Sequence, residues 1–482
     1  MAKDNEKVKK LKEKLLYDIP NQWDERDNKF QKKVQQFTVE YKEALNEGKT
    51  EREYIRWTVE LLEKNGFKRY EDMAELKPGD RVYRVLRQKG LLAAVIGKKD
   101  PAEGFNIVGS HVDSPRLDLK PNALYEDKDL VYLKTHYYGG IKKYHWIGTQ
   151  LSLHGVVYLK NGKRVDLNIG EKEDDPVFTI TDLLPHLGRK QMAKKASEVV
   201  AGEQLNILFG GIPYPDKETE GRFKLGILNL LNKEYGIVER DLHTAEIEIV
   251  PAHKAKDVGL DRAFIGAYGQ DDRVCAYTST RALIDSKDSE YTNLIMLFDK
   301  EEIGSDGNTG AQSQSYRYAL HDLHQRIIGR EPAMCELHRN LENTHLLSSD
   351  VTAAFDPTFA DVSDPKNSAY AGSGIGVNKY TGSGGKYSTS DAGSEFFNHI
   401  TRLFDANDIP WQAAEMGGVD EGGGGTIAKY FANLGIEVID CGVALFSMHS
   451  CFEIASTMDI YNTYRAYLAF LEKNKRPMFG TK

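Results

Sequence analysis

The sequence predicts an α/β domain, built from residues 1–118 and 251–482, that is interrupted by a β-rich insertion over residues 119–250. Charged amphipathic helix patterning runs to about Lys68, and short apolar runs bounded by small or polar residues follow it. The middle of the chain changes to alternating apolar and polar residues, and the α/β pattern then returns. Because 482 residues are too many for one ordinary core, two domains are expected.

The α/β part is predicted from apolar runs and helix periodicity. FNIVG and NLIMLFD are short apolar runs typical of buried strands, and VCAYTSTRALIDS has the spacing of a helix. GGGGTIAKYFANLG is predicted to be a glycine loop that leads into a helix. Open α/β sheets carry their functional sites at the C-terminal ends of the strands, so polar residues there are the first candidates.

The insertion is predicted from a different pattern of apolar and polar residues. LVYLKTHYYGG, QLSLHGVVYLKNGKRVDLNIG and TAEIEIVP alternate apolar and polar residues, as antiparallel strands with one buried face do. The pair Asn161-Gly162 within the second stretch indicates a tight hairpin turn.

Composition excludes several classes of protein. Hydrophobic residues make up 40% and charged residues 28%, which is ordinary for a globular chain. The net charge of -8 offers no basic excess for nucleic acid, and no apolar run approaches the ~20 residues of a membrane span. The four cysteines lack CxxC spacing and are expected to be buried free thiols in a reducing, cytoplasmic setting: Cys275, Cys335, Cys441 and Cys451.

Two adjacent acids, Glu301 and Glu302, follow the apolar run NLIMLFD. Successive strand side chains point to opposite faces, so the pair alone fits a solvated turn. The functional interpretation is that one acid binds a metal ion while its neighbour reaches a metal-bound water.

Four other segments place metal-binding residue types where a predicted element ends: His111, Asp271, Asp350 and His449. Each alone also fits a satisfied core histidine or a helix N-cap. Asp113, two residues after His111, would orient the imidazole through its second nitrogen.

Taken together, these residues predict a metal site. Nitrogen and oxygen ligands without thiolates suit zinc, manganese or cobalt. Five ligands are too many for one catalytic zinc with an open position, but they suit two metals that share a bridging carboxylate. The sequence has no G-x-S-x-G elbow and no P-loop, so serine hydrolase and NTPase interpretations lack support.

Five blocks, in the order SHVDSPRLDLKP, GQDDRVCAY, FDKEEIGS, SSDVTAAFDP and SMHS, resemble the signatures of the M18 metallo-aminopeptidases, which include aspartyl aminopeptidases and the aminopeptidase I type. The resemblance covers the chain from about His111 to the C-terminus. It implies a mixed-sheet zinc-peptidase catalytic domain sandwiched by helices. It also implies that residues 119–250 form a dimerisation domain.

The resemblance also implies roles for individual residues. Glu301 matches the general base, Asp113 the residue that orients His111, and His186 a histidine that the insertion supplies to a neighbouring subunit's site. Two divalent ions per subunit are expected, zinc first and cobalt or manganese as alternatives, with five ligands: His111, Asp271, Glu302, Asp350 and His449. Related enzymes carry a cis peptide after the bridging aspartate, so a cis Asp271-Asp272 bond is predicted.

The sequence departs from the pattern of the aspartyl aminopeptidases at one position that concerns substrate specificity. Aspartyl aminopeptidases carry a lysine before a VN pair to meet an acidic P1 side chain, and here Gly376 occupies that position. Lys379 or Lys386 could compensate, so acidic and neutral P1 residues both stay open. The loop from Asp420 to Gly425 is a candidate wall of the specificity pocket, and Asp420 or Glu421 is a candidate partner for the substrate's free ammonium.

The expected substrates are therefore peptides, and the expected assembly is a homo-oligomer, with dimers forming a dodecamer. Two alternatives stay open at this point. One is the related M42-type aminopeptidase, whose insertion would differ from the 119–250 segment. The other is a non-catalytic assembly or cargo protein that keeps the fold.

Overall fold

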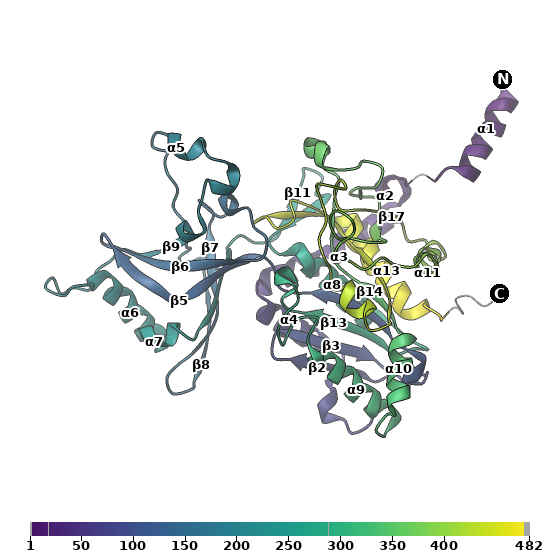
Figure 1. Cartoon of the computed structure of the whole chain (residues 1–482), viewed down its shortest axis with the longest axis horizontal. Helices are drawn as coiled ribbons and strands as arrows, with labels where there is room; N and C mark the ends of the chain where they lie inside the picture. The colour runs from purple at the N-terminus through teal and green to yellow at the C-terminus, as the bar shows by residue number, and fades with distance from the viewer. Residues whose placement is uncertain (1, 18, 288, 477–482) are drawn as a thin grey trace.

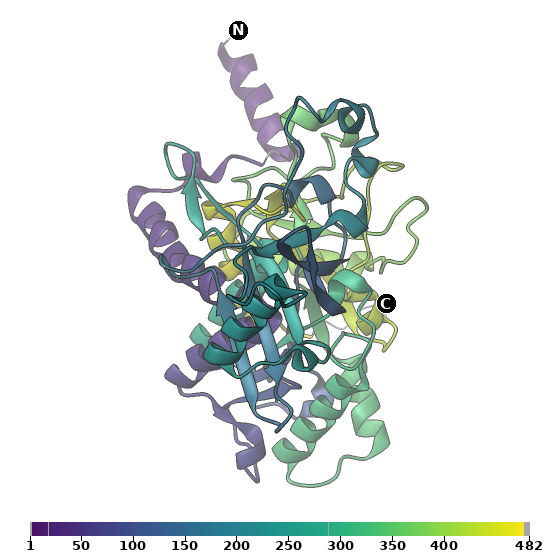
Figure 2. The same ribbon diagram turned by 90° about the vertical axis from the view of Figure 1, so that its left-hand side faces the viewer.

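A computed structural model describes residues 2–17, 19–287 and 289–476. Two lobes are visible in Figure 1: a larger α/β lobe on the right and a smaller β-rich lobe on the left. Figure 2 views the molecule from the side of the smaller lobe. The N-terminal helix α1 (Ala2–Leu15) projects away from the larger lobe. The predicted α/β fold is confirmed.

The larger lobe is built on a nine-stranded mixed sheet. Strands β13, β4, β14 and β18 are mutually parallel and form its centre, because each is a short apolar run buried on both faces. In order across the sheet, the strands are β1 (Lys68–Arg69), β2 (Arg81–Leu86), β3 (Gly90–Val95), β13 (Asn293–Phe298), β4 (Asn106–His111), β14 (His345–Ser348), β18 (Glu437–Gly442), β16 (Ile375–Asn378) and β17 (Trp411–Ala413).

Helices cover both faces of this sheet. Neighbouring residues of one strand enter different cores, as Ile107 and Val108 of β4 do, because strand side chains alternate between faces. One face packs against α3 (Asn28–Glu47), α4 (Glu51–Lys64), α8 (Gln270–Asp285), α11 (Ser394–Asp405) and α13 (Thr457–Lys473). The other packs against α9 (Gln314–Ile328), α10 (Met334–Glu342) and α12 (Ala428–Ala432).

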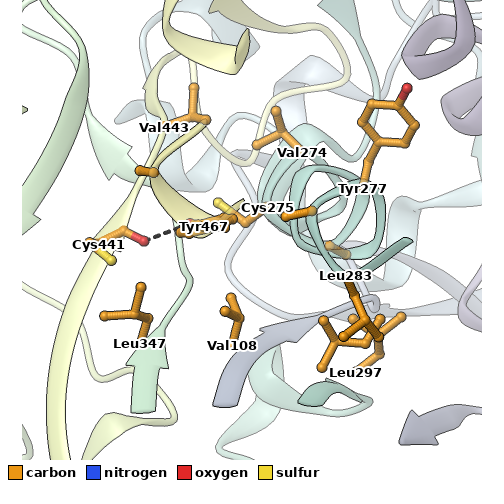
Figure 3. Packing of buried hydrophobic residues seen from close by; sticks show 14 of the residues in the cluster. Val108, Val274, Cys275, Tyr277, Leu283, Leu297, Leu347, Cys441, Val443 and Tyr467 are labelled. Carbon is orange, nitrogen blue, oxygen red and sulfur yellow. Dashed lines mark hydrogen bonds between the residues drawn. The ribbon is translucent and has the colours of Figure 1, made fainter. Parts of the chain in front are cut away.

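Helix α8 is buried between the sheet and the surrounding helices. Figure 3 shows Val274 and Cys275 of α8 close to Tyr467 of α13, above sheet residues such as Leu347. The Tyr467 hydroxyl donates a 2.8 Å hydrogen bond to the carbonyl of Cys441, so a polar group inside this core keeps a partner. This packing fixes the start of α8, where Asp271 lies.

The smaller lobe contains a six-stranded antiparallel sheet. As predicted, Asn161-Gly162 lies in a hairpin, in which Tyr158 of β7 pairs with Arg164 of β8. Two helices, α6 (Arg222–Tyr235) and α7 (Glu239–Leu242), pack on it. The strand order is β8 (Arg164–Ile169), β7 (Leu151–Tyr158), β10 (Glu246–Pro251), β5 (Arg116–Asp127), β6 (Leu130–Tyr138) and β9 (Asn206–Gly210).

A third sheet, of five strands, lies beside the nine-stranded one and was not predicted. Its strands are β11 (Lys256–Val258), β12 (Phe264–Ala267), β20 (Glu453–Ser456), β19 (Ala444–Phe446) and β15 (Thr352–Ala353). These strands are only two to four residues long, too short for a clear period in the sequence.

The structure can be compared with the predictions about the cysteines and about membrane spans. Cys275, Cys441 and Cys451 are buried free thiols as predicted, but Cys335 is exposed on α10, so that prediction was wrong for one of the four. Within the described ranges, no helix is long and apolar enough to cross a membrane.

Candidate active site

The five predicted segments meet in one place, although they come from two sheets. His111 is the last residue of β4, Glu301 and Glu302 follow β13, and Asp350 follows β14, all in the nine-stranded sheet. Asp271 follows β12 at the start of α8, and His449 follows β19, both adjoining the five-stranded sheet. The expectation that strand ends would carry the polar residues therefore holds, and the junction of two sheets brings them together.

Asp271 lies at the centre of the cluster, and its two carboxylate oxygens face different histidines. Its Oδ1 is 3.2 Å from His111 Nε2, and its Oδ2 is 3.1 Å from His449 Nε2. The peptide bond from Asp271 to Asp272 is cis, as predicted. A carboxylate with one oxygen on each side has the arrangement needed to bridge two cations.

Each histidine has a carboxylate on its own side of Asp271. His111 Nε2 is 3.8 Å from Asp350 Oδ1, and His449 Nε2 is 3.5 Å from Glu302 Oε1. That Glu302 oxygen is buried and has no hydrogen-bond partner within the described part of the chain. A buried carboxylate oxygen without a donor is costly unless a cation faces it.

The donor set fits divalent metal ions. Imidazole nitrogens and carboxylate oxygens, without thiolates, are ligands that zinc, manganese and cobalt accept. One compact group contains His111, Asp271 and Glu302, and another contains His111, Asp272 and Asp350. Asp272 was not predicted as a ligand; its Oδ2 accepts the backbone N–H of His111 at 3.2 Å, which fixes the end of β4.

Asp113 holds neighbouring residues of the site in place through hydrogen bonds. It is fully buried, and its carboxylate accepts the backbone N–H groups of Glu301 and Glu302 at 3.1 and 3.2 Å. His111 Nδ1 lies 3.0 Å from the Asp113 carbonyl oxygen and 3.4 Å from Oδ1. This contact leaves His111 Nε2 facing Asp271, as the predicted orienting role requires.

The expectation that the Glu301 and Glu302 side chains point to opposite faces, as successive residues of a strand do, is wrong. The two acids lie in a 3₁₀ turn, Glu301–Ile303, and Lys300 before them has a left-handed φ of 68°. The chain therefore leaves strand geometry after β13, and both carboxylates line the same pocket. The two different roles predicted for these acids do not require their side chains to point to opposite faces.

The acids raise one another's pKa. Burial raises the pKa of Glu301 and the charge of His111 opposes that rise, but with the nearby carboxylates of Asp350 and Asp113 the pKa still reaches about 8. Burial and then Asp271 raise the pKa of Glu302 well above its usual range. Burial lowers the pKa of His449, but its hydrogen bond with Asp271 and the charge of Glu302 outweigh burial and raise it to about 10. This surplus of negative charge is what bound cations would offset.

A pocket of about 400 Å³ opens onto these residues. Its other walls include Val351, Met416, Met448, Lys429 and the glycines Gly423–Gly425. The glycine loop was predicted as a wall, and this part of it does line the pocket. Thr426, which ends the loop, donates a 2.7 Å hydrogen bond to the buried Asp440 and so anchors it.

Three residues singled out from the sequence lie outside this pocket. Asp420 is exposed on the loop before Gly423 and is not among the lining residues. Lys386 pairs with Asp391 at 3.1 Å and lies over the ring of Tyr380. His186 is exposed near α5 (Arg189–Met192) in the smaller lobe, and the single chain does not bring it to the cluster.

Glu453 is a buried residue of the site that no sequence pattern indicates. Its Oε1 accepts the backbone N–H of His449 at 2.8 Å, and its Oε2 accepts that of Asp271 at 3.1 Å. It therefore fixes two of the predicted ligands at once. No local pattern surrounds Glu453, and only the pairing of β20 with β12 brings it to Asp271.

Comparison with known proteins agrees with this geometry. The family model for aminopeptidase I zinc metalloprotease (M18) matches residues 44–471. A probable M18 family aminopeptidase 1 of Clostridium acetobutylicum is 47% identical over 461 residues, covering 95% of this chain and 99% of that protein. A probable M18 family aminopeptidase 1 of Thermotoga maritima is 46% identical over 440 residues, covering 91% and 96%.

Solved structures give the same result. The crystal structure of an M18 family aminopeptidase from Thermotoga maritima has a TM-score of 0.91 at 44% identity, over 95% of this chain and all of that one. Aminopeptidase I from Clostridium acetobutylicum gives 0.90 at 46%, with coverage of 95% and 100%. The S. cerevisiae mApe1 dodecamer gives 0.73 at 21%, over 92% and 97%, a likeness that shows the fold alone. The M42-type alternative is set aside, and the chain belongs to the M18 family of metallo-aminopeptidases.

Proposed function

We propose that this aminopeptidase removes the N-terminal residue of peptides with water activated between two metal ions. The observation that carries the proposal is the position of Asp271, whose two oxygens face His111 and His449 separately. His111, Asp350 and Asp271 would hold one ion, and His449, Glu302 and Asp271 the other. When bound, the pair of ions lowers the pKa of a water molecule and polarises the scissile carbonyl.

Glu301 is the general base in this proposal. Its Oε2 is 4.0 Å from His111 Nε2, so its carboxylate lies beside the ligand cluster and within the pocket. It would take a proton from the attacking water and return it to the leaving amine. Asp113 positions Glu301 through the turn amides and is not itself in the pocket.

A second part of the proposal concerns the smaller lobe. We propose that residues 119–250 are an inserted dimerisation domain and that residues 1–118 and 251–482 form the catalytic domain. His186 would then complete a neighbouring subunit's site, which its exposure permits. The mApe1 dodecamer, which shares the fold, supports a closed homo-oligomer of dimers for this chain as well.

The two-metal proposal predicts a zinc content of about two ions per chain after dialysis against zinc. Chelation should abolish aminopeptidase activity, and added zinc should restore it. A third acidic group, Glu51, Glu246 and Glu248, is close enough to hold an ion, but Lys89 and Arg116 already pair with it. We therefore expect no third ion.

The control for that experiment is Glu246→Gln, which should leave the zinc content at about two. Metal content is measured by atomic absorption and activity with aminoacyl substrates. One firmly bound ion per fully active chain would rule out the two-metal site, and loss of zinc in Glu246→Gln would point to the third group.

We propose further that the pocket prefers a neutral P1 residue. A side chain at Gly376 would meet Thr352 Cγ2 at 2.8 Å, so no cation can replace that glycine without a shift. Lys379 lines a different cavity, and Lys386 is paired with Asp391. Apolar side chains, Val351, Met416 and Met448, line the site instead.

A substrate panel tests this preference. We expect kcat/KM for leucyl and methionyl substrates to exceed that for aspartyl and glutamyl substrates by about 10-fold or more, the discrimination that apolar burial provides. Faster cleavage of the acidic substrates would contradict the proposal and would assign their recognition to Lys429, the lysine among the lining residues.

A further inference from the structure

The end of β6 reaches from the smaller lobe into the ligand cluster. Three consecutive residues there, Tyr138, Gly139 and Gly140, each touch a different part of the site, and we name them the strap. The Tyr138 hydroxyl donates a 2.8 Å hydrogen bond to Asp113 Oδ2. Asp113 in turn accepts from the amides of Glu301 and Glu302 and contacts the His111 ring.

Gly139 passes directly against a ligand carboxylate. Its φ is +71°, and a Cβ placed on it would lie 3.3 Å from both Cβ and Oε2 of Glu302. A side chain at this position would therefore be strained by the backbone and would also press on Glu302. The glycine allows the strap to run beside the carboxylate without displacing it.

Gly140 orients the second histidine. His449 Nδ1 lies 2.9 Å from the Gly140 carbonyl oxygen, to which it donates. A carbonyl on Nδ1 leaves Nε2 free to face Asp271 and Glu302, as in metal-bound histidines. The strap thus contacts the Nδ1 side of both histidines, through Asp113 for His111 and directly for His449.

The strap is itself held firmly. The Arg116 guanidinium lies 3.9 Å from the centre of the Tyr138 ring, a cation–π contact in a buried setting. Arg116 also pairs with Glu51 of α4 and with Glu248 of β10, each at 3.4 Å. The pair with Glu51 joins the smaller lobe to the larger one, and the pair with Glu248 lies within the six-stranded sheet, so the position of the strap depends on both lobes.

From these contacts we propose that the strap orients both histidines so that their Nε2 atoms face the metal ions. Tyr138 is the positioning residue of the strap. The inference rests on the two-metal function proposed above. It gives the smaller lobe a role within its own subunit's site, separate from any role in dimerisation. Tyr138 does not touch substrate; it acts through Asp113.

Tyr138→Phe tests the hydrogen bond without emptying the buried space. We expect zinc affinity, measured by competition with a chromogenic chelator, to fall by about 10-fold or more, as it does when an outer partner of a ligand is removed. The visible spectrum of the cobalt-substituted protein should change, and kcat should fall with little change in KM.

The matched control is Tyr137→Phe, the same substitution one residue away. Tyr137 is exposed, and its hydroxyl makes no hydrogen bond with the described residues. It should keep the wild-type zinc affinity and cobalt spectrum. Equal losses in both variants, or no loss of zinc affinity in Tyr138→Phe, would overturn the role of the tyrosine.

A second pair of variants tests the strap independently. Gly139→Ala and Gly148→Ala introduce the same methyl group at nearly the same φ, +71° and +70°, but no atom lies within 4 Å of the new Cβ at Gly148. Zinc affinity should fall by about 10-fold or more in Gly139→Ala relative to Gly148→Ala. Equal affinities would show that the contact with Glu302 does not matter.

The zinc content of the wild-type protein separates failure of the two-metal function from failure of the strap inference. If it binds fewer than two zinc ions, the proposed two-metal function fails, whatever the strap variants do. If it binds two, and the Tyr138 and Gly139 variants bind them as tightly as their controls, the strap inference alone fails.

Discussion

Replacing Glu301 with glutamine is expected to lower kcat by about 10²- to 10⁴-fold, the usual contribution of a general base, while zinc stays bound. The amide has nearly the shape of the carboxylate but cannot take a proton from water. The five proposed ligands keep their positions, because Asp113 fixes the turn through the backbone N–H groups rather than through the Glu301 side chain. The measurement is kcat on an aminoacyl substrate beside the zinc content of the same sample.

Glu103→Gln is the matched control for that experiment. Glu103 is an exposed carboxylate that pairs with Lys99 at 3.0 Å, an interaction worth little in water. It should keep wild-type activity and zinc. Full activity in Glu301→Gln would remove Glu301 from the mechanism, and loss of zinc along with activity would make it a ligand.

The positions of Glu301 and Glu302 illustrate what a sequence can predict. Their position after a buried strand follows from the apolar run before them, which is local information. Their common orientation does not, because it depends on the left-handed φ of Lys300, a residue without glycine's usual preference for that conformation. The sequence therefore located the acids but predicted the wrong geometry for their side chains.

Non-local contacts explain the other residues that were missed. Glu453 reaches Asp271 because β20 pairs with the distant strand β12, and Tyr138 reaches the site through a side-chain hydrogen bond to Asp113. Neither residue belongs to a local motif. The reverse holds for Asp420 and Lys386, which are close in sequence to residues of the pocket wall: Asp420 does not line the pocket, and Lys386 pairs with Asp391. Proximity along the chain was a poor guide in an irregular loop.

Replacing Asp271 with asparagine is expected to weaken the binding of both ions, because the two oxygens of this carboxylate face the two histidines separately. An amide keeps one oxygen and presents an N–H₂ group, which repels a cation, on the other side. We expect zinc affinity to fall by more than about 100-fold for at least one ion, since loss of an outer partner alone costs 10–100-fold. Zinc content should drop from about two to one or fewer, and activity should be lost.

The zinc affinities of variants at the two acids that each face one histidine show whether this result is specific to a shared carboxylate. Asp350→Asn should weaken only the ion beside His111, and Glu302→Gln only the ion beside His449, because each acid faces one histidine. Thermal unfolding of the metal-free variants shows whether each protein is folded before zinc is added. If Asp271→Asn loses no more zinc than Asp350→Asn, the two ions do not share Asp271. Two-metal activation of water would then need another bridging group, and Asp272, which lies close to His111 and Asp350, would be the residue to test next.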